Sequence, residues 1–444
     1  MILRPYQTRC IEQTREAFGR SRSVCIVAPT GAGKTLLGLE VVRRTLERRP
    51  HARALWIAHR TELIDQARDR ADMQLNGTAD RLMVATVQGL AVGKEYPAAD
   101  LVVWDESHHA SASAPHWYQV AEHYADSWRL GLTATPQRGD GSPLGDVFGE
   151  MVVAAEYSEL IEGGWLVPCK VLRPERQLKG TELAQDPVDA WMAMAPDRQG
   201  FLFGGRVAEC HEYASRLREA GITAEVIAGD TPSQDRDRHL RDFRAGKVQV
   251  LCSVYVLTEG VDVPAAEVCM LARGCQHAGT YLQMAGRVLR PSPGKTEALL
   301  LDLTGVSWVH GLPTDDREYA LDGRAIKTKG QAEAEAEAEE ALGDREITIY
   351  SMELLEVYAG SQTPKAAKVA EWSRLVGVAR DRRWSLDWAG REYAKLFDGP
   401  PPASMDEKAE TMRSLRIRAS EKGYKKGWAS HRYRAAFGVW PKGV

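Results

Sequence analysis

A short segment near the N-terminus contains the residue types that bind phosphate groups. It runs Ala-Pro-Thr-Gly-Ala-Gly-Lys-Thr from Ala28 to Thr35, with Ala28 at the position where the usual pattern has its first glycine. An apolar run at residues 24–28 leads into it, and an amphipathic stretch follows at residues 36–48. The segment is therefore predicted to be a loop between a buried strand and a helix N-terminus, a favourable place for an anion.

Each part of this loop has chemistry suited to a nucleoside triphosphate. Gly31 and Gly33 allow backbone N–H groups to turn toward a phosphate, and the helix N-terminus adds its positive end. Lys34 can reach the β- and γ-phosphate oxygens, and the Thr35 hydroxyl can ligate Mg²⁺. An ordinary glycine turn is the alternative, and the strand–loop–helix context argues against it. The residues expected to contact the nucleotide here are Pro29, Thr30, Gly31, Ala32, Gly33, Lys34 and Thr35.

An acidic pair follows another apolar run. Residues 101–104 are predicted to form a buried strand, and Asp105 and Glu106 come directly after it. Carboxylates that leave a strand beside a phosphate loop suit a Mg²⁺-holding Asp105 and a water-activating Glu106. The alternative is a pair of solvated carboxylates in a loop.

Short apolar runs alternate with amphipathic stretches over the first 310 residues. Helical patterns, such as those at 36–48 and 210–220, lie between most of the runs, and this alternation predicts parallel sheets covered on both faces. Ligands bind such sheets at the carboxyl ends of the strands. The expected strands are 24–28, 54–58, 101–104, 129–133, 201–203, 224–228, 248–253, 268–272 and 298–303.

Composition divides the chain into five parts. A proline-containing irregular stretch at 157–197 separates two strand series, and residues 331–340 are an acidic Ala-Glu tract that cannot build a core. Five of the twelve tryptophans lie after that tract, in a helical pattern. The predicted parts are an ATP-binding domain at 1–165, a linker at 166–195, a second α/β domain at 196–312, an acidic helical spacer at 313–345, and a small, mostly helical domain at 346–444.

The overall composition excludes several classes of protein. Of 444 residues, 44% are hydrophobic and 27% charged, as in globular proteins. No apolar run approaches the length of a membrane span, and the N-terminus lacks a signal-peptide pattern, so an intracellular protein is expected. Seven scattered cysteines with no Cys-x-x-Cys pair argue against a disulfide framework and a zinc ribbon.

The net charge of −3 is unevenly distributed. Residues 408–444 contain ten basic and two acidic side chains, a balance of +8, which leaves −11 for the rest of the chain. Basic residues alternate with aromatic ones there, a combination suited to phosphate contact and base stacking on nucleic acid. The alternative is a small helical module with core aromatics and a solvated basic face. The candidate contacts are Arg413, Arg416, Lys425, Lys426, Trp428, Arg432 and Arg434.

Nine short motifs, taken in order, resemble those of the superfamily 2 helicases over about residues 1–310. Besides the phosphate loop, the matching segments are Arg4-Pro-Tyr-Gln7, Ala58-His-Arg60, Thr86-Val-Gln88, Asp105-Glu-Ser-His108, Thr133-Ala-Thr135, Phe201-Leu-Phe203, the stretch from Thr258 to Pro264, and the stretch from Gln283 to Arg290. The resemblance implies two tandem RecA-like domains with ATP and Mg²⁺ bound in the cleft between them, in a cytoplasmic protein of a bacterium or a phage-infected cell.

The resemblance also implies roles for individual residues. Gln7 offers a donor and an acceptor to an adenine edge, with Arg4 and Tyr6 beside it, and Gly260 and Asp262 would approach the ribose. The catalytic set would be Lys34, Asp105, Glu106 and His108 with the arginine fingers Arg287 and Arg290, which are expected on one face of a helix. Thr133, Thr135 and Gln283 would couple the nucleotide state to domain movement. His59, Arg60, Thr86 and Gln88 would hold a nucleic-acid backbone, or else cap helices.

These observations together predict an ATP-dependent DNA helicase or translocase that binds nucleic acid and works with replication, repair or restriction proteins. An RNA helicase and a duplex DNA translocase that never separates strands are alternative enzymes. A nucleotide-switched module that binds nucleic acid or protein without movement is the alternative from another class.

Overall fold

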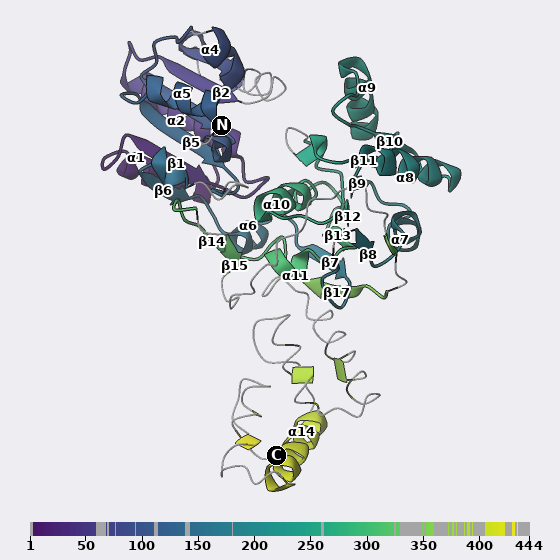
Figure 1. Ribbon diagram of the computed structural model, residues 1–444. Helices are drawn as coiled ribbons and strands as arrows, with labels where there is room; N and C mark the ends of the chain where they lie inside the picture. Colours follow the sequence, from purple (N-terminus) through teal and green to yellow (C-terminus); the bar gives the residue numbers. More distant parts are fainter. Residues whose placement is uncertain are drawn as a thin grey trace.

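The computed structural model describes most of the chain up to residue 358 and selected residues beyond it (Figure 1). Residues 1–2, 59–67, 69–70, 76, 94, 111–113, 138–142, 180, 259–261, 324–325, 329–347 and 350–351 are not described. After residue 358, the structure describes 372, 375–376, 379, 386, 389–390, 393, 405–421, 429–430 and 433.

The first domain is built on a six-stranded, all-parallel sheet in the order β3-β2-β4-β5-β1-β6. Its strands are β1 (Ser23–Val27), β2 (Ala54–Ala58), β3 (Leu82–Thr86), β4 (Leu101–Asp105), β5 (Trp128–Thr133) and β6 (Glu150–Val153). Every residue of β1, β2 and β4 is buried, as expected for strands covered on both faces. The four strands expected in this half are present, and β3 and β6 are additional edge strands.

Helices cover both faces of this sheet. α1 (Pro5–Ala17) and α2 (Lys34–Arg48) share one apolar cluster with alternate residues of the central strands. α4 (Val87–Gly93) and α5 (Pro115–His123) share a second cluster with the intervening residues. Since successive strand residues face opposite sides of the sheet, one cluster lies on each of its two faces.

The second domain has a seven-stranded sheet in the order β10-β11-β9-β12-β13-β7-β17. Its strands are β7 (Cys169–Arg173), β9 (Gly200–Gly204), β10 (Ala224–Val226), β11 (Val250–Ser253), β12 (Val268–Ala272), β13 (Ala298–Asp302) and β17 (Leu355–Tyr358). All pairs are parallel except β17 with β7. α7 (Pro187–Met194) and α8 (Val207–Glu219) cover one face, and α9 (Ser233–Arg244) and α10 (Ala278–Gly286) cover the other.

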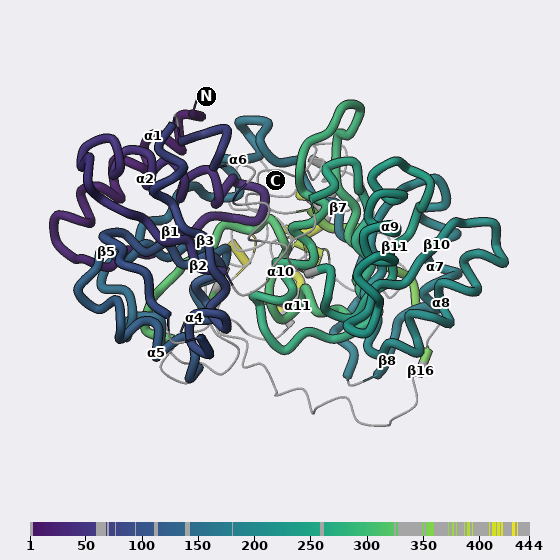
Figure 2. The backbone as a smooth tube through the Cα atoms, turned by 90° about the horizontal axis from the view of Figure 1, so that it is seen from above, coloured from purple at the N-terminus to yellow at the C-terminus, as the bar shows by residue number. Residues whose placement is uncertain are grey.

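The two domains lie side by side, with α10 between the sheets (Figure 2). One apolar cluster includes the α1–α2 face of the first sheet and the α9–α10 face of the second. Residues of α6 (Tyr157–Glu162) and the segment after it, including Leu160, Leu166 and Val167, belong to the same cluster. The connection between the domains is therefore part of their shared core.

The segments expected to be a linker and a spacer contain regular structure. Residues 166–195 hold β7, β8 (Glu182–Leu183) and α7, and β7 pairs with β13 inside the second sheet. After α11 (Ser307–His310), the chain returns to the first domain, where Gly145 N–H donates to Leu321 O at 2.7 Å. Within the expected spacer, β14 (Arg317–Glu318) pairs with β15 (Lys327–Thr328), and its acidic tract at 331–340 lies outside the described residues. β16 (Thr348–Ile349), which follows the spacer, pairs with β8.

The C-terminal part has a small core of its own. α14 (Met405–Glu421) buries Met412 and Leu415, while Arg413 and Arg416 are exposed. Trp372, Tyr393 and Tyr433 are buried in the same cluster. Tyr433 therefore serves the core, although it stands between two candidate nucleic-acid contacts.

All seven cysteines are buried and none forms a disulfide. Among the described helices, none is long and apolar enough to cross a membrane.

Candidate nucleotide-binding site

The phosphate loop leaves β1 and turns directly into α2. Ala28 N–H donates to Thr133 O at 2.9 Å, so the loop begins while still attached to the neighbouring strand β5. Gly31 has φ +93° and Gly33 has φ +83°, backbone conformations that side chains with a Cβ rarely adopt. Gly33 is the N-cap of α2, which places Lys34 and Thr35 in its first turn. The loop thus has the geometry of an anion cradle at a helix N-terminus.

The acidic pair also lies at the carboxyl ends of the strands, on β4, which is separated from β1 by β5. Asp105 is the last residue of β4, and Glu106 has φ +48°, the one positive φ outside glycine in the described part of the chain. The Lys34 Nζ atom is 3.6 Å from Glu106 Oε1. The positive φ at Glu106 costs roughly 1–3 kcal/mol and persists where the surrounding structure imposes it. The lysine and the carboxylate expected to act on one nucleotide therefore already lie together.

The electrostatics of this pair suit a cation. Burial, together with the neighbouring Glu106 carboxylate, raises the pKa of Asp105 to about 7, and Lys34 opposes the shift. Thr30 Oγ1 is buried and has no hydrogen-bond partner among the residues that the structure describes, whereas the buried Glu106 Oε2 has His108 Nδ1 at 3.5 Å. Buried polar atoms without partners are costly, so a ligand that meets them would be favoured.

These residues fit a Mg²⁺–nucleotide pair. The Thr35 hydroxyl and the Asp105 carboxylate would hold the Mg²⁺, since this ion prefers oxygen ligands. A bound Mg²⁺ neutralises charge on the phosphate oxygens. Lys34 would then exchange Glu106 for phosphate, which frees the Glu106 carboxylate.

A chain of short contacts links the acidic pair to the end of β5. His108 Nδ1 is 3.1 Å from Thr133 Oγ1 and 3.5 Å from Glu106 Oε2. The Thr133 hydroxyl donates to Thr135 O at 2.9 Å and accepts from Thr135 N–H at 3.1 Å. These contacts join Glu106 to Thr135 through the side chains of His108 and Thr133.

The second domain contacts this site through α10 and the turn after it. A Cβ at Gly286 would lie 2.5 Å from Thr30 Cβ, and one at Gly279 would lie 3.0 Å from Thr135 Oγ1. The helix of the second domain thus packs directly on the phosphate loop and on the end of β5. Gln283, on the same helix, is buried.

The two arginines expected as fingers lie beyond the helix. α10 ends at Gly286, so Arg287 is its C-cap and Arg290 lies in the following turn. The expectation that they share a helix face is wrong, because the chain leaves the helix at the Gly-Arg step. The turn nevertheless brings Arg290 to the loop: its Cγ is 3.2 Å from the Cβ position of Gly31. Arg287 is buried, and Arg290 forms an ion pair with Asp262.

The expected adenine-reading residues lie against the other side of the loop. Tyr6 OH donates to Ala32 O at 2.7 Å, and Gln7 Nε2 is 3.5 Å from the same oxygen. Arg4 N–H donates to Gln7 Oε1 at 3.0 Å. Sequence reasoning missed Trp165, whose ring centroid is 4.9 Å from that of Tyr6. Its position after a glycine pair in an irregular stretch gave no periodic signal.

The expected nucleic-acid contacts are described only in part. The Thr86 hydroxyl accepts from Gly89 N–H at 2.9 Å and so caps α4, while Gln88 is exposed. Arg413 and Arg416 are exposed on α14. The other nucleic-acid candidates lie outside the described residues: His59, Arg60, Lys425, Lys426, Trp428, Arg432 and Arg434. Gly260, which is expected near the ribose of the nucleotide, also lies outside them.

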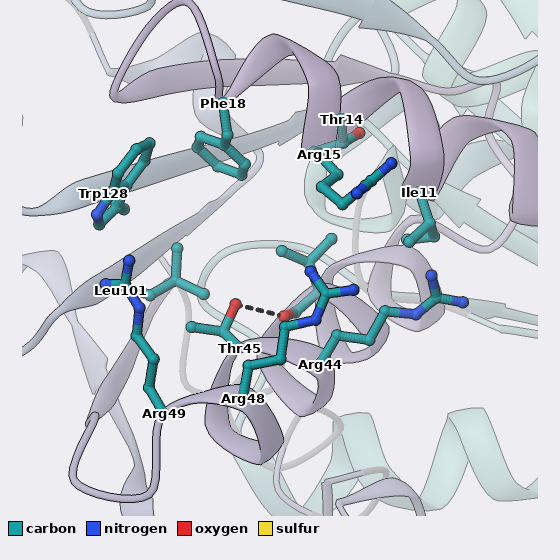
Figure 3. Close-up of a pocket in the computed structure, with 11 residues that line it drawn as sticks. Ile11, Thr14, Arg15, Phe18, Arg44, Thr45, Arg48, Arg49, Leu101 and Trp128 are labelled. Carbon is teal, nitrogen blue, oxygen red and sulfur yellow. Dashed lines mark hydrogen bonds between the residues drawn. The ribbon is translucent and has the colours of Figure 1, made fainter.

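A separate cavity of about 210 Å³ lies at the amino-terminal ends of the strands of the first sheet, opposite the phosphate loop (Figure 3). Its lining includes Leu101 and Trp128, the first residues of β4 and β5, and arginines from the last turns of α1 and α2. Figure 3 shows Arg15 of α1 near Arg44 and Arg48 of α2 among the side chains that line it. Because the phosphate loop lies at the carboxyl ends of the strands, this cavity is not the nucleotide site.

Comparisons with known proteins agree with this arrangement. The family described as "Type III restriction enzyme, res subunit" matches residues 1–138, and the "Helicase conserved C-terminal domain" matches residues 186–292. A 51.5 kDa protein of a Lactococcus phage is 30% identical over 335 residues, which cover 69% of this chain and 71% of that protein. The chain belongs to the superfamily 2 helicases.

Two further similarities extend this result. The DNA 3'-5' translocase XPB2 of Sulfurisphaera tokodaii is 24% identical over 376 residues, covering 68% of this chain and 81% of that one. The structure of the Type ISP restriction-modification enzyme LlaBIII bound to DNA has a TM-score of 0.54 at 15% identity and shares the fold, covering 68% of this chain and 28% of that one. As a member of this superfamily, the chain is a nucleic-acid-dependent ATPase with two RecA-like domains.

Proposed function

We propose that this enzyme is an ATP-dependent DNA helicase or translocase whose nucleotide site is split between the two domains. The observation that carries the proposal is the approach of the Arg290 turn to the phosphate loop, 3.2 Å from the Cβ position of Gly31. A nucleotide on the loop would have Lys34 and Asp105 on one side and the two arginines on the other. Its phosphates would be the shared partner of both domains.

The division of the site suggests how hydrolysis produces movement. A triphosphate with Mg²⁺ contacts both domains and so favours the closed cleft, and departure of the γ-phosphate removes part of that attraction. Glu106, freed from Lys34, is the candidate to activate the attacking water. If nucleic acid spans both domains, alternate closure and opening moves the protein along the strand.

DNA is favoured over RNA as the partner. The DNA 3'-5' translocase XPB2 is similar in sequence, and the restriction enzyme LlaBIII, whose structure has DNA bound, shares the fold. The basic C-terminal part, with Arg413 and Arg416 exposed on α14, is proposed as an accessory contact to phosphates. Replication, repair or restriction proteins are the proposed partners.

The test is ATP turnover by the full chain with a panel of nucleic acids. Single-stranded DNA, duplex DNA, forked DNA and RNA of equal length are compared at saturation, with Lys34→Ala as the inactive control. We expect the largest stimulation by DNA. Greater stimulation by RNA would replace the proposal with an RNA helicase, and turnover without any stimulation would exclude both.

A further inference from the structure

The cavity at the amino-terminal ends of the first sheet is lined by apolar and basic side chains, with two threonines among them (Figure 3). Thr14 and Thr45 each donate their hydroxyl to a backbone carbonyl of their own helix at 2.8 Å. None of the lining residues is acidic. The apolar ones are Ile11, Phe18, Val41, Leu101 and Trp128. The cavity therefore offers an occupant apolar contact and positive charge.

The arginines of this cavity differ from others on the same helices in their lack of carboxylate partners. Arg44 pairs with Glu40 at 2.7 Å, and Arg9, farther along α1, pairs with Glu159 at 2.7 Å. Three of the four lining arginines are exposed and form no ion pair with any residue that the structure describes: Arg15, Arg48 and Arg49. A position at the end of a helix suits a basic side chain, because it complements the helix dipole. That attraction explains the arginines but not the apolar cavity beside them.

The size and position of the cavity limit what can occupy it. Its volume of about 210 Å³ is below the roughly 300–1,000 Å³ of pockets that enclose a small-molecule ligand or cofactor. One or two apolar side chains would suit it better. Thr86, an expected nucleic-acid contact, is the last residue of β3, whereas Leu101 is the first residue of β4. Because the sheet is parallel, nucleic acid held at Thr86 would lie at the opposite ends of the strands.

We propose that this cavity is a docking site for an acidic segment of a partner protein. One aromatic or aliphatic side chain of the segment enters the cavity, and flanking carboxylates bind Arg15, Arg48 and Arg49. Guanidinium groups hold carboxylates through two parallel hydrogen bonds, and a side chain enclosed in an apolar pocket supplies most of the affinity in many interfaces. This docking goes beyond the proposed ATPase function and does not depend on it, since the phosphate loop lies at the other ends of the strands.

The test measures binding of a fluorescein-labelled peptide, Asp-Glu-Phe-Glu-Asp, to the full chain by fluorescence anisotropy. The peptide should bind, and added salt should weaken the binding by screening the charges. Lysine in place of its acidic residues should abolish binding. Alanine in place of its phenylalanine should weaken binding by about tenfold, because the apolar contact is lost. Single-stranded DNA should not displace the peptide.

Two variants of the protein separate the charges from the cavity. Arg48→Glu should weaken binding by about tenfold, since it replaces an attraction by a repulsion. Arg244→Glu is the matched control, because Arg244 is also an exposed arginine in the last turn of a helix, α9 of the second domain. It should leave the affinity unchanged. Thr45→Phe fills the cavity while every arginine remains, and it should also weaken binding. Thermal unfolding and ATP turnover should be unchanged in all three variants.

Four outcomes would overturn the proposal. They are no binding of the acidic peptide, equal weakening by Arg48→Glu and Arg244→Glu, full affinity in Thr45→Phe, and displacement of the peptide by single-stranded DNA. The last result would assign the cavity to nucleic acid. Absence of ATP hydrolysis in the parent protein would refute the proposed function and leave the docking site standing.

Discussion

A methyl group added at Gly286 should uncouple the two halves of the site without unfolding either domain. Gly286 ends α10, and a Cβ there would lie 2.5 Å from Thr30 Cβ and 2.9 Å from Thr30 Cγ2. Carbon atoms that touch are about 3.5–4.0 Å apart, so the Gly286→Ala variant must move the helix and the loop apart by ~1 Å. The arginine turn follows α10 directly and would move with it.

The expected fall in activity follows from that displacement. A misplacement of about 1 Å can cost ~10²-fold in rate, and an arginine finger is worth about 10³–10⁵-fold, so kcat should fall by about 10²-fold. ATP affinity should change less, because Lys34 and Asp105 belong to the first domain. Alanine favours a helix over glycine by about 1 kcal/mol, so the second domain itself should not lose stability.

The assay is steady-state ATP turnover with saturating DNA, together with thermal unfolding. Gly229→Ala is the matched control, since a Cβ at Gly229 meets nothing within 4 Å. A Gly286→Ala variant whose kcat stays within threefold of the Gly229→Ala control would refute the idea that this packing sets the position of the fingers. A lower unfolding temperature of the Gly286→Ala variant, but not of the Gly229→Ala control, would mean that the slower turnover results from lost stability.

The remaining predictions address the chemistry and the C-terminal part. Lys34→Ala and Glu106→Gln should both abolish hydrolysis, while Glu106→Gln still binds ATP in an equilibrium assay; substantial turnover by Glu106→Gln would remove its assigned role. Arg287→Ala and Arg290→Ala should each lower kcat by about 10³-fold or more with unchanged unfolding temperatures, and turnover within twofold of the parent would contradict the assignment. Truncation after Tyr358 should keep basal hydrolysis and weaken DNA binding. The log–log salt slope should become shallower by about 0.7–0.9 for each DNA phosphate that the truncated protein no longer neutralises. Unchanged affinity and slope in the truncated protein would make the C-terminal part a structural or protein-docking module.

The place of that truncation illustrates what composition does not reveal. Composition predicts one accessory domain at residues 346–444, yet β17 pairs with β7, and Val357 is buried in the second domain. A cut in the acidic tract would remove an edge strand of the second sheet. A four-residue strand carries too little pattern to be recognised before its partner is known.

The buried central strands are the easiest elements to predict. Residues 54–58 and 268–272 coincide with β2 and β12, because continuous apolar runs are typical of strands covered on both faces. The edge strand β3 is only partly buried and is absent from the expected strands. Likewise, β7 lies in a proline-containing stretch that resembles a linker until its pairing with β13 is seen.

The candidate site shows the same division between local and distant information. Local spacing is enough to predict the loop at Gly31 and Gly33 and the strand-end carboxylate Asp105. The end of α10 before Arg287 and the approach of Trp165 to Tyr6 depend on packing between segments far apart in the sequence. No periodicity within either segment carries that information.

The most direct test of a split, nucleic-acid-dependent site is phosphate release by the full chain and by Arg290→Ala, each with and without saturating single-stranded DNA. If ATP is hydrolysed between the domains, DNA should raise turnover several-fold in the parent protein, and Arg290→Ala should hydrolyse little ATP under either condition. Turnover that is the same with and without DNA, or that survives in Arg290→Ala at the parent rate, would contradict the account.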